Sequence, residues 1–192
     1  MAVAAPAAGH GHHVHPKRAA MNRVGLWLFF FSESIVFALL AMTRFYLKGI
    51  EIDKVDQALG LGITIILLAS SVSAFTAETA IEHDRRTLAS WGLFITIALG
   101  VLFAFGVAFE WYTAEFTKDS AFGTAFFTMT GMHAFHVISG VFMLGLVWAQ
   151  LLRGRYSSKD HWPFSGIVMY WHFVDIVWVF FYPALYLVST PK

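Results

Sequence analysis

The stretch LASWGLFITIALGVLFAFGVAF, residues 88–109, decides the fold because it contains no charged side chain. An α-helix rises about 1.5 Å per residue, so roughly 20 apolar residues cross the hydrocarbon core of a bilayer. Four further stretches are long and apolar enough: residues 24–43, 58–77, 122–152 and 166–188. The stretch at 122–152 exceeds the length of a span and is expected to tilt or project. The pattern predicts an all-α membrane protein with five transmembrane helices in a bundle.

The composition supports this prediction and argues against other classes of protein. Of the 192 residues, 58% are hydrophobic and 13% are charged, which is too little polar material to cover an apolar core in water. The 13 basic and 12 acidic residues give a net charge of +1, so nucleic acid is not an expected partner. The absence of cysteine excludes disulfides, thiolate-bound metal clusters and covalently attached c-type haem.

The basic residues between the apolar stretches predict the orientation. Eight lie on the side of the N-terminus and five on the opposite side. Because basic residues accumulate on the cytoplasmic face, the N-terminus is expected in the cytoplasm and the C-terminus outside. The first group is Lys17, Arg18, Arg23, Arg85, Arg86, Arg153, Arg155 and Lys159, and the second is Arg44, Lys48, Lys54, Lys118 and Lys192.

The N-terminal segment divides the chain into two parts. Residues 1–21 are rich in Ala and Gly, which predicts a disordered cytoplasmic tail, and residues 22–192 form the five-span transmembrane domain. Clustered imidazoles can bind a divalent metal weakly, but a solvated terminus is the favoured interpretation. The tail imidazoles are His10, His12, His13 and His15.

Glu33 is an ionisable residue predicted at membrane depth. It lies about nine residues into the first apolar stretch, near the bilayer centre. A carboxyl group there is costly unless it is neutral, paired or turned toward a polar interior. Two interpretations stay open, because such a carboxyl group can relay protons or can simply hydrogen-bond a neighbouring helix.

Two pairs of polar residues lie in the last two apolar stretches. His133 and His136 share one helix face, and His172 and Asp175 repeat the same spacing. They are either metal or haem ligands or an interhelical polar network. Bis-histidine haem needs two facing imidazoles at one depth, whereas His133 is expected in the outer half and His172 in the inner half. His136 is closer in depth to His172, yet no complete ligand set exists, so a network without metal is favoured.

Charged residues at the predicted membrane edges are interface candidates. Charges at these positions usually contact water or lipid headgroups rather than form a site. Phe and Trp are expected in packing and interfacial positions, and Pro183 is expected to kink the last helix. The candidates for lipid contact are Glu78, Glu82, Arg85 and Glu110.

Five short segments of the chain form a recognisable set. They are FSE at 31–33, EHDR at 82–85, EWY at 110–112, GMHAFHVISG at 131–140 and YWHFVDIVW at 170–178. Taken together, these segments resemble subunit III of haem-copper terminal oxidases in its five-helix bacterial form. The agreement in order and spacing runs from about residue 22 to residue 188. Departures occur at Met132, Ala134 and Phe135, and many relatives have seven spans.

The resemblance implies an accessory subunit in a bacterial inner membrane, without a redox cofactor of its own. It implies a catalytic subunit I with haem and copper, a subunit II and bound phospholipid, in a complex that reduces oxygen and translocates protons. It further implies that the chain supports proton uptake and protects subunit I during turnover. Glu33 corresponds to the buried carboxyl group of the family, and the network residues correspond to its intramembrane polar positions.

Several alternative functions stay open at this point. A quinol oxidase subunit III and a nitric-oxide reductase accessory protein share the same fold. A freestanding haem carrier using His136 and His172 belongs to a different class, as does a transporter with Glu33 as its coupling group. The transporter is disfavoured because no internal repeat is evident.

Overall fold

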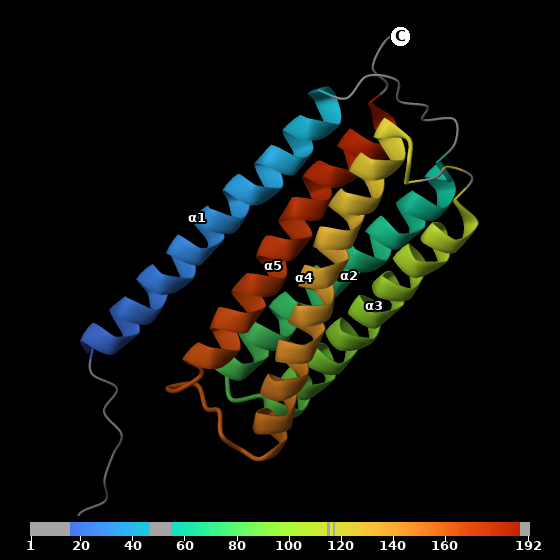
Figure 1. Cartoon of the computed structure of the whole chain (residues 1–192). Helices are drawn as coiled ribbons and strands as arrows, with labels where there is room; N and C mark the ends of the chain where they lie inside the picture. Colours follow the sequence, from blue (N-terminus) through green and yellow to red (C-terminus); the bar gives the residue numbers. More distant parts are fainter. Residues whose placement is uncertain (1–15, 47–54, 115, 117, 189–192) are drawn as a thin grey trace, which may run out of the picture.

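The computed structural model describes residues 16–46, 55–114, 116 and 118–188, and all regular elements among them are helical. Five helices are long and apolar enough to cross a membrane, which confirms the predicted fold class. The orientation of the termini stays a prediction. In chain order the elements are α1 (Pro16–Tyr46), α2 (Gln57–Glu82), α3 (Arg86–Thr113), α4 (Ala121–Leu152), α5 (Trp162–Tyr182) and the π-helical segment η2 (Pro183–Leu187) (Figure 1).

Helix α1 begins earlier than the apolar pattern indicates. It starts at Pro16, so residues 16–21 are helical although they were expected in the tail. Proline is favoured in the first turn of a helix, because its missing N–H group has no partner there in any case. The remainder of the predicted tail, including the four imidazoles at positions 10–15, lies outside the described residues.

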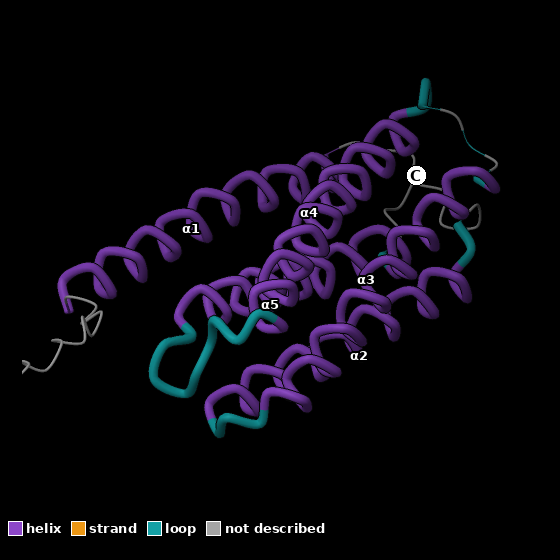
Figure 2. Tube along the Cα trace, turned by 90° about the horizontal axis from the view of Figure 1, so that it is seen from below, coloured by secondary structure: helices purple, strands orange, loops and turns teal. Residues whose placement is uncertain are grey.

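The five helices form a bundle with α5 inside and α1 at one edge. Helices α2 and α3 make a tightly packed hairpin, whereas α1 contacts only α4, α5 and η2 to any extent. Figure 2 shows α1 on the opposite side of α4 and α5 from this hairpin. In the most apolar part of each helix, 56% of the α5 residues are buried, against 11% in α1. Helix α5 is therefore the core of the bundle, and most of α1 faces the surroundings.

Tryptophan side chains join the helices through their indole N–H groups. Trp171 and Trp178 of α5 are fully buried and donate hydrogen bonds to Ser70 (3.0 Å) and Thr64 (2.9 Å) of α2. Trp111 of α3 donates to α4 in the same way, and so does Trp148 of α4 to α3. A buried indole needs such a partner, so each bond fixes how two neighbouring helices face each other.

Glycines make room for the Trp171 ring. A Cβ atom added at Gly100 of α3 would lie 2.5 Å from this ring, and one at Gly140 of α4 would lie 2.9 Å from it. Small residues allow helices to approach closely in membranes, and these two glycines do so around one indole ring.

Replacing Gly100 by alanine is expected to destabilise the bundle by about 1–2 kcal/mol, since overpacking a filled core costs roughly this much. Gly62→Ala is the matched control, because no atom lies within 4 Å of the added methyl group. Alanine is the better helix former, so the control should gain up to about 1 kcal/mol. Thermal unfolding in one detergent compares them, and equal stability of both variants would contradict the prediction.

The last helix changes its geometry at Pro183, where a kink was expected. Helix α5 ends at Tyr182, and residues Pro183–Leu187 form a π-helical segment. Proline has no N–H group to continue the α-helical hydrogen bonds, so the backbone widens here. The segment ends where the Val188 N–H group donates to the Pro183 carbonyl at 3.0 Å.

Candidate functional site

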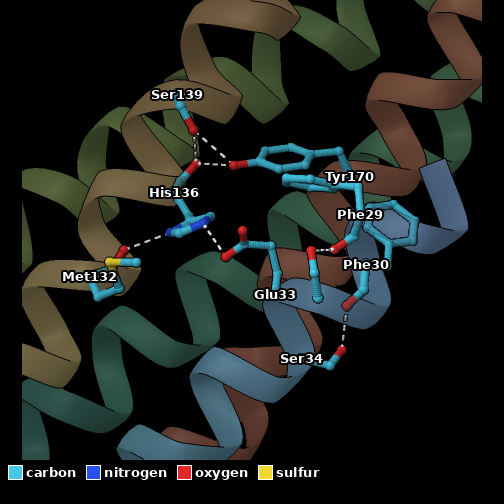
Figure 3. Close-up of polar contacts among 9 residues, drawn as sticks. Phe29, Phe30, Glu33, Ser34, Met132, His136, Ser139 and Tyr170 are labelled. Atoms are coloured by element: carbon cyan, nitrogen blue, oxygen red, sulfur yellow. Dashed lines mark hydrogen bonds and ion pairs between the residues drawn. The ribbon is translucent and has the colours of Figure 1, made fainter. Parts of the chain in front are cut away.

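Glu33 of α1 meets His136 of α4 inside the membrane-spanning part of the bundle. Glu33 Oε2 lies 3.3 Å from His136 Nε2 (Figure 3). The Glu33 side chain is 21% exposed and the His136 side chain 7%, so the carboxyl group lies nearer to the bundle surface. The sequence placed Glu33 at this depth but gave no partner for it.

The His136 imidazole is held by its own helix and lies beside a second contact between α4 and α5. Its Nδ1 atom lies 2.8 Å from the Met132 carbonyl oxygen. Ser139 and Tyr170 form a hydroxyl–hydroxyl hydrogen bond of 2.8 Å between these helices. Both hydroxyl groups also lie within hydrogen-bond distance of the His136 carbonyl oxygen, at 2.8 and 3.2 Å, so their two hydrogen atoms serve three contacts (Figure 3). The imidazole orientation therefore rests on α4, and the position of α4 against α5 is fixed one turn away.

His172 and Asp175 of α5 face α2 rather than α4. His172 Nδ1 lies 2.8 Å from Ser71 Oγ. The Ser71 hydroxyl also faces the buried carboxyl group of Asp175, but at a geometry short of a regular hydrogen bond. The two polar residues of α5 thus face the same hydroxyl group of α2, but only His172 forms a hydrogen bond with it.

His133 is separate from both of these groups. It is fully buried between aromatic rings, with the Trp178 ring 4.7 Å and the Phe103 ring 5.6 Å from it. Neither ring nitrogen has a hydrogen-bond partner within the described part of the chain. The structure therefore places the four predicted network residues in three separate environments.

The arrangement does not present His136 and His172 as a facing pair of haem ligands. His136 is bonded to α1 and His172 to α2, through different partners. Among the described residues, no group of three or more His, Cys, Asp or Glu side chains is placed to hold a metal ion.

Glu110 lies inside the bundle, although its position at the end of α3 suggested lipid contact. It is only 4% exposed, and the Tyr186 hydroxyl group lies 2.8 and 2.7 Å from its two carboxyl oxygens. Tyr186 belongs to the π-helical segment and is fully buried. Gln57 of α2 donates to the Tyr186 carbonyl at 3.3 Å, so three elements meet here. The hydropathy pattern indicates how far along the span Glu110 lies, but not which face of α3 carries it. That face determines whether the side chain meets lipid or Tyr186.

Arg44 is a second buried charge that the sequence pattern misses. It was expected in the loop after the first span, but it lies in the last turn of α1 with no exposed surface. Its Nη2 atom donates to the Val188 carbonyl at 2.9 Å, and the guanidinium lies over the Phe122 ring at 5.7 Å. An arginine usually ends a predicted span because its charge is costly in hydrocarbon, so no sequence signal indicated this burial.

The other interface candidates lie where α2 ends. Glu82 and Arg85 are exposed, and Glu78 is half-buried. Beside Arg85 a shallow pocket of about 270 Å³ opens on the outside of the α2–α3 hairpin. It is lined by Phe75, Thr76, Thr79, Ala80, His83, Arg85 and Leu88.

Asp84 connects the α2–α3 turn to the loop between α4 and α5. Its backbone is left-handed, with φ of 53°, which turns the carboxylate toward the other loop. Ser158 donates to it from its hydroxyl group at 2.6 Å and from its backbone N–H at 2.8 Å. These hydrogen bonds hold the pKa of Asp84 below its ordinary value.

Replacing Asp84 by alanine is expected to speed hydrogen exchange of the Ser158 amide at neutral pH. Folding lowers the pKa of this carboxyl group, so its stabilising contribution is present above its ordinary pKa. The contribution is lost as the pH falls through the lowered pKa. Wild-type protection should therefore decrease on acidification toward that of Asp84→Ala. Asp119→Ala, in the turn before α4, is the control, and equal protection at Ser158 in all three proteins would contradict the prediction.

A long apolar groove runs between α1 and α5. Its two parts have volumes of about 440 and 420 Å³ and share Ser34, Phe173 and Ile176. From Trp27 to Ala41 the groove follows α1 for about 21 Å, at 1.5 Å per residue. The only polar side chains lining it are Ser34 and His172 among the described residues.

Comparison with known protein families identifies the bundle. The sequence model of the family described as cytochrome c oxidase subunit III matches residues 2–190, which is nearly the whole chain. The chain belongs to the cytochrome c oxidase subunit III family. The resemblance stated from the sequence motifs is thereby confirmed, and the chain is a multi-pass membrane protein of this family.

Individual members of the family are similar over about two thirds of the chain. A cytochrome c oxidase subunit 3 from Spodoptera frugiperda is 43% identical over 124 residues, covering 64% of this chain and 84% of the relative. The Equus caballus protein of that name is 42% identical over 64% of this chain, but only 48% of its own length is matched. The Patiria pectinifera protein is 40% identical, with 46% of its length matched. The chain thus spans about half the length of the latter two relatives.

Proposed function

We propose that this chain is the accessory subunit III of a respiratory haem-copper oxidase in a bacterial cell membrane. The match of residues 2–190 to the subunit III family carries the proposal. In the proposed complex, subunit I holds the haem and copper groups and reduces oxygen, and subunit II accompanies it. The chain itself supplies no redox centre and acts through lipid binding, proton supply and protection of subunit I.

The groove between α1 and α5 is the proposed binding site of a phospholipid acyl chain. It is membrane-embedded, almost entirely apolar and about 21 Å long, against about 30 Å for the hydrocarbon core. A lipid chain in this groove would contact both the edge helix and the core helix. It would also provide contact surface that α1 itself does not make with α5.

The pocket beside Arg85 is a second proposed lipid contact. Arg85 and His83 line it together with the apolar side chains of Phe75 and Leu88. Arg85 makes no ion pair with any residue that the structure describes. An anionic headgroup is therefore the complementary ligand for this pocket.

Glu33 is the proposed contribution to proton uptake. A carboxyl group at membrane depth is costly, and such groups usually transfer protons, bind ions or pair with another polar group. Its partly exposed side chain lies on the edge helix, where a neighbouring subunit can approach it.

Copurification tests the identity of the complex. The tagged chain is extracted in a mild detergent, and its largest neighbour is identified by mass spectrometry and by its absorption spectrum. A haem-copper subunit in stoichiometric amount is the expected result. A haem spectrum retained by the isolated chain alone would instead support a haem carrier and overturn the proposal.

Deletion of the gene tests the accessory role. The remaining oxidase is expected to reduce oxygen initially and to lose activity during turnover faster than the complete complex. Glu33→Gln should assemble normally but support a lower rate of proton uptake. Undiminished lifetime without the chain would refute the protective role, and unchanged proton uptake in Glu33→Gln would refute the role of this carboxyl group.

A further inference from the structure

The His136 imidazole is held in one tautomer by its own helix. Its Nδ1 atom lies 2.8 Å from the Met132 carbonyl oxygen, which can only accept a hydrogen bond. Nδ1 must therefore carry a hydrogen atom. In the neutral ring the other nitrogen, Nε2, then has no hydrogen and directs its lone pair toward Glu33 Oε2 at 3.3 Å.

This geometry restricts how many protons the pair can hold between Nε2 and the carboxyl group, in addition to the hydrogen on Nδ1. With no proton, a carboxylate oxygen faces a lone pair, and the two repel each other. With two protons, an imidazolium faces a neutral acid, and its charge is uncompensated at membrane depth. One proton makes a hydrogen bond in either direction, as acid to imidazole or as imidazolium to carboxylate. We infer that Glu33 and His136 together form a binding site for a single proton.

The surroundings of the pair favour the same proton count. On α4, His133 lies one turn before His136, fully buried and without a hydrogen-bond partner among the described residues. On α5, the Tyr170 hydroxyl group contacts the Ser139 hydroxyl group and the His136 carbonyl oxygen. On α1, the Phe37 ring packs against the His136 ring at 4.9 Å. None of these contacts compensates the charge of a His136 imidazolium once Glu33 is protonated, whereas the Glu33 carboxylate does.

The proton can move within the site without any other reactant. The O–H bond of the Glu33 acid breaks as the Nε2–H bond of His136 forms, leaving a carboxylate and an imidazolium in contact. No electron transfer is involved. Glu33 is the more exposed member, so exchange with an outside donor or acceptor takes place at its carboxyl group, and His136 holds the proton on the inner side. The use of this proton during turnover rests on the proposed function, whereas the site itself does not.

Magic-angle-spinning NMR on the full chain in lipid, with isotope-labelled histidine and glutamate, measures the proton count. The His136 signal is assigned by its loss in His136→Gln, and the Glu33 signal by its loss in Glu33→Gln. The expected spectrum shows Nδ1 protonated and one further proton on the pair. A carboxylate facing an unprotonated Nε2, or an acid facing an imidazolium, would overturn the inference.

Two variants provide the control for this measurement. His136→Gln keeps a polar group near Glu33 but cannot take up a proton, so the Glu33 signal should shift. His172→Gln removes an imidazole that bonds Ser71 instead, so the same signal should stay unchanged. If His136→Gln does not accumulate, Glu33→Gln carries the test, because His136 should then be the neutral Nδ1 tautomer only. A Glu33 signal insensitive to His136, or an imidazolium persisting in Glu33→Gln, would overturn the inference.

Turnover of the copurified complex separates the site from the proposed function. Glu33→Gln, His136→Gln and the double variant are expected to lower proton uptake by the same factor, because each removes the same proton. If NMR shows the single proton but all three variants turn over normally, the proton-supply role fails and the site stands. If Glu33→Gln alone slows uptake while His136→Gln does not, the shared site fails and the role of Glu33 stands.

Discussion

Replacing Trp171 by alanine is expected to destabilise the bundle by about 3–5 kcal/mol, the usual cost of truncating a fully buried large aromatic side chain. Trp171 has no exposed surface, and its ring lies against Gly100 of α3 and Gly140 of α4. Its indole N–H donates to Ser70 of α2 at 3.0 Å. Truncation would remove contacts with three helices at once and leave a cavity that two glycines cannot fill.

The free energy of unfolding in a fixed detergent measures this effect. Trp91→Ala is the matched control, because the Trp91 side chain is 61% exposed on the outside of the bundle. Its truncation should change stability by less than about 0.5 kcal/mol, as is usual for surface positions. Similar losses in both variants would show that Trp171 does not hold the helices together.

Replacing Tyr186 by phenylalanine is expected to cost about 2–3 kcal/mol, near the upper end for a buried acceptor left without its donor. Tyr186 is the hydrogen-bond donor to both carboxyl oxygens of the buried Glu110. Phenylalanine keeps the ring but removes the hydroxyl group, so the loss comes from Glu110 and not from packing.

A double-variant cycle checks this explanation. Combining Tyr186→Phe with Glu110→Leu should recover part of the lost stability, because no polar group is then left unpaired. Tyr112→Phe is the control, since Tyr112 is 87% exposed. A double variant less stable than Tyr186→Phe alone would contradict the assignment of the loss to Glu110.

The spans were predictable because length and apolar content suffice to define them. Four of the five predicted stretches lie within observed helices, and the fifth runs through α5 and η2 and ends one residue beyond, at Val188. The ends were less predictable. Helix α1 extends back to Pro16 and forward through Arg44 to Tyr46, and each extension contains charged residues that hydropathy assigns to water. Hydropathy describes how an isolated helix partitions between lipid and water, whereas the helix ends depend on contacts with the neighbouring helices.

The presence of Glu33 within an apolar helix was predictable, but its pairing was not. Its place along α1 follows from counting residues in one helix, whereas its partner His136 depends on how α1 and α4 are rotated. The same limit explains Glu110, which lies near the end of α3 but faces Tyr186. The tryptophan hydrogen bonds to Ser and Thr were missed for a related reason, because a single sequence does not reveal which hydroxyl group faces which indole.

The position of α1 at the edge of the bundle has a consequence for biosynthesis. Helix α1 is translated before α4 and α5, so its contact surface on them follows about a hundred residues later, or roughly 5–20 s at usual elongation rates. During that interval Glu33 has no imidazole to meet and α1 has no helix to pack against. A membrane insertion factor that shelters polar groups until α4 emerges would therefore act mainly on α1, which carries Glu33.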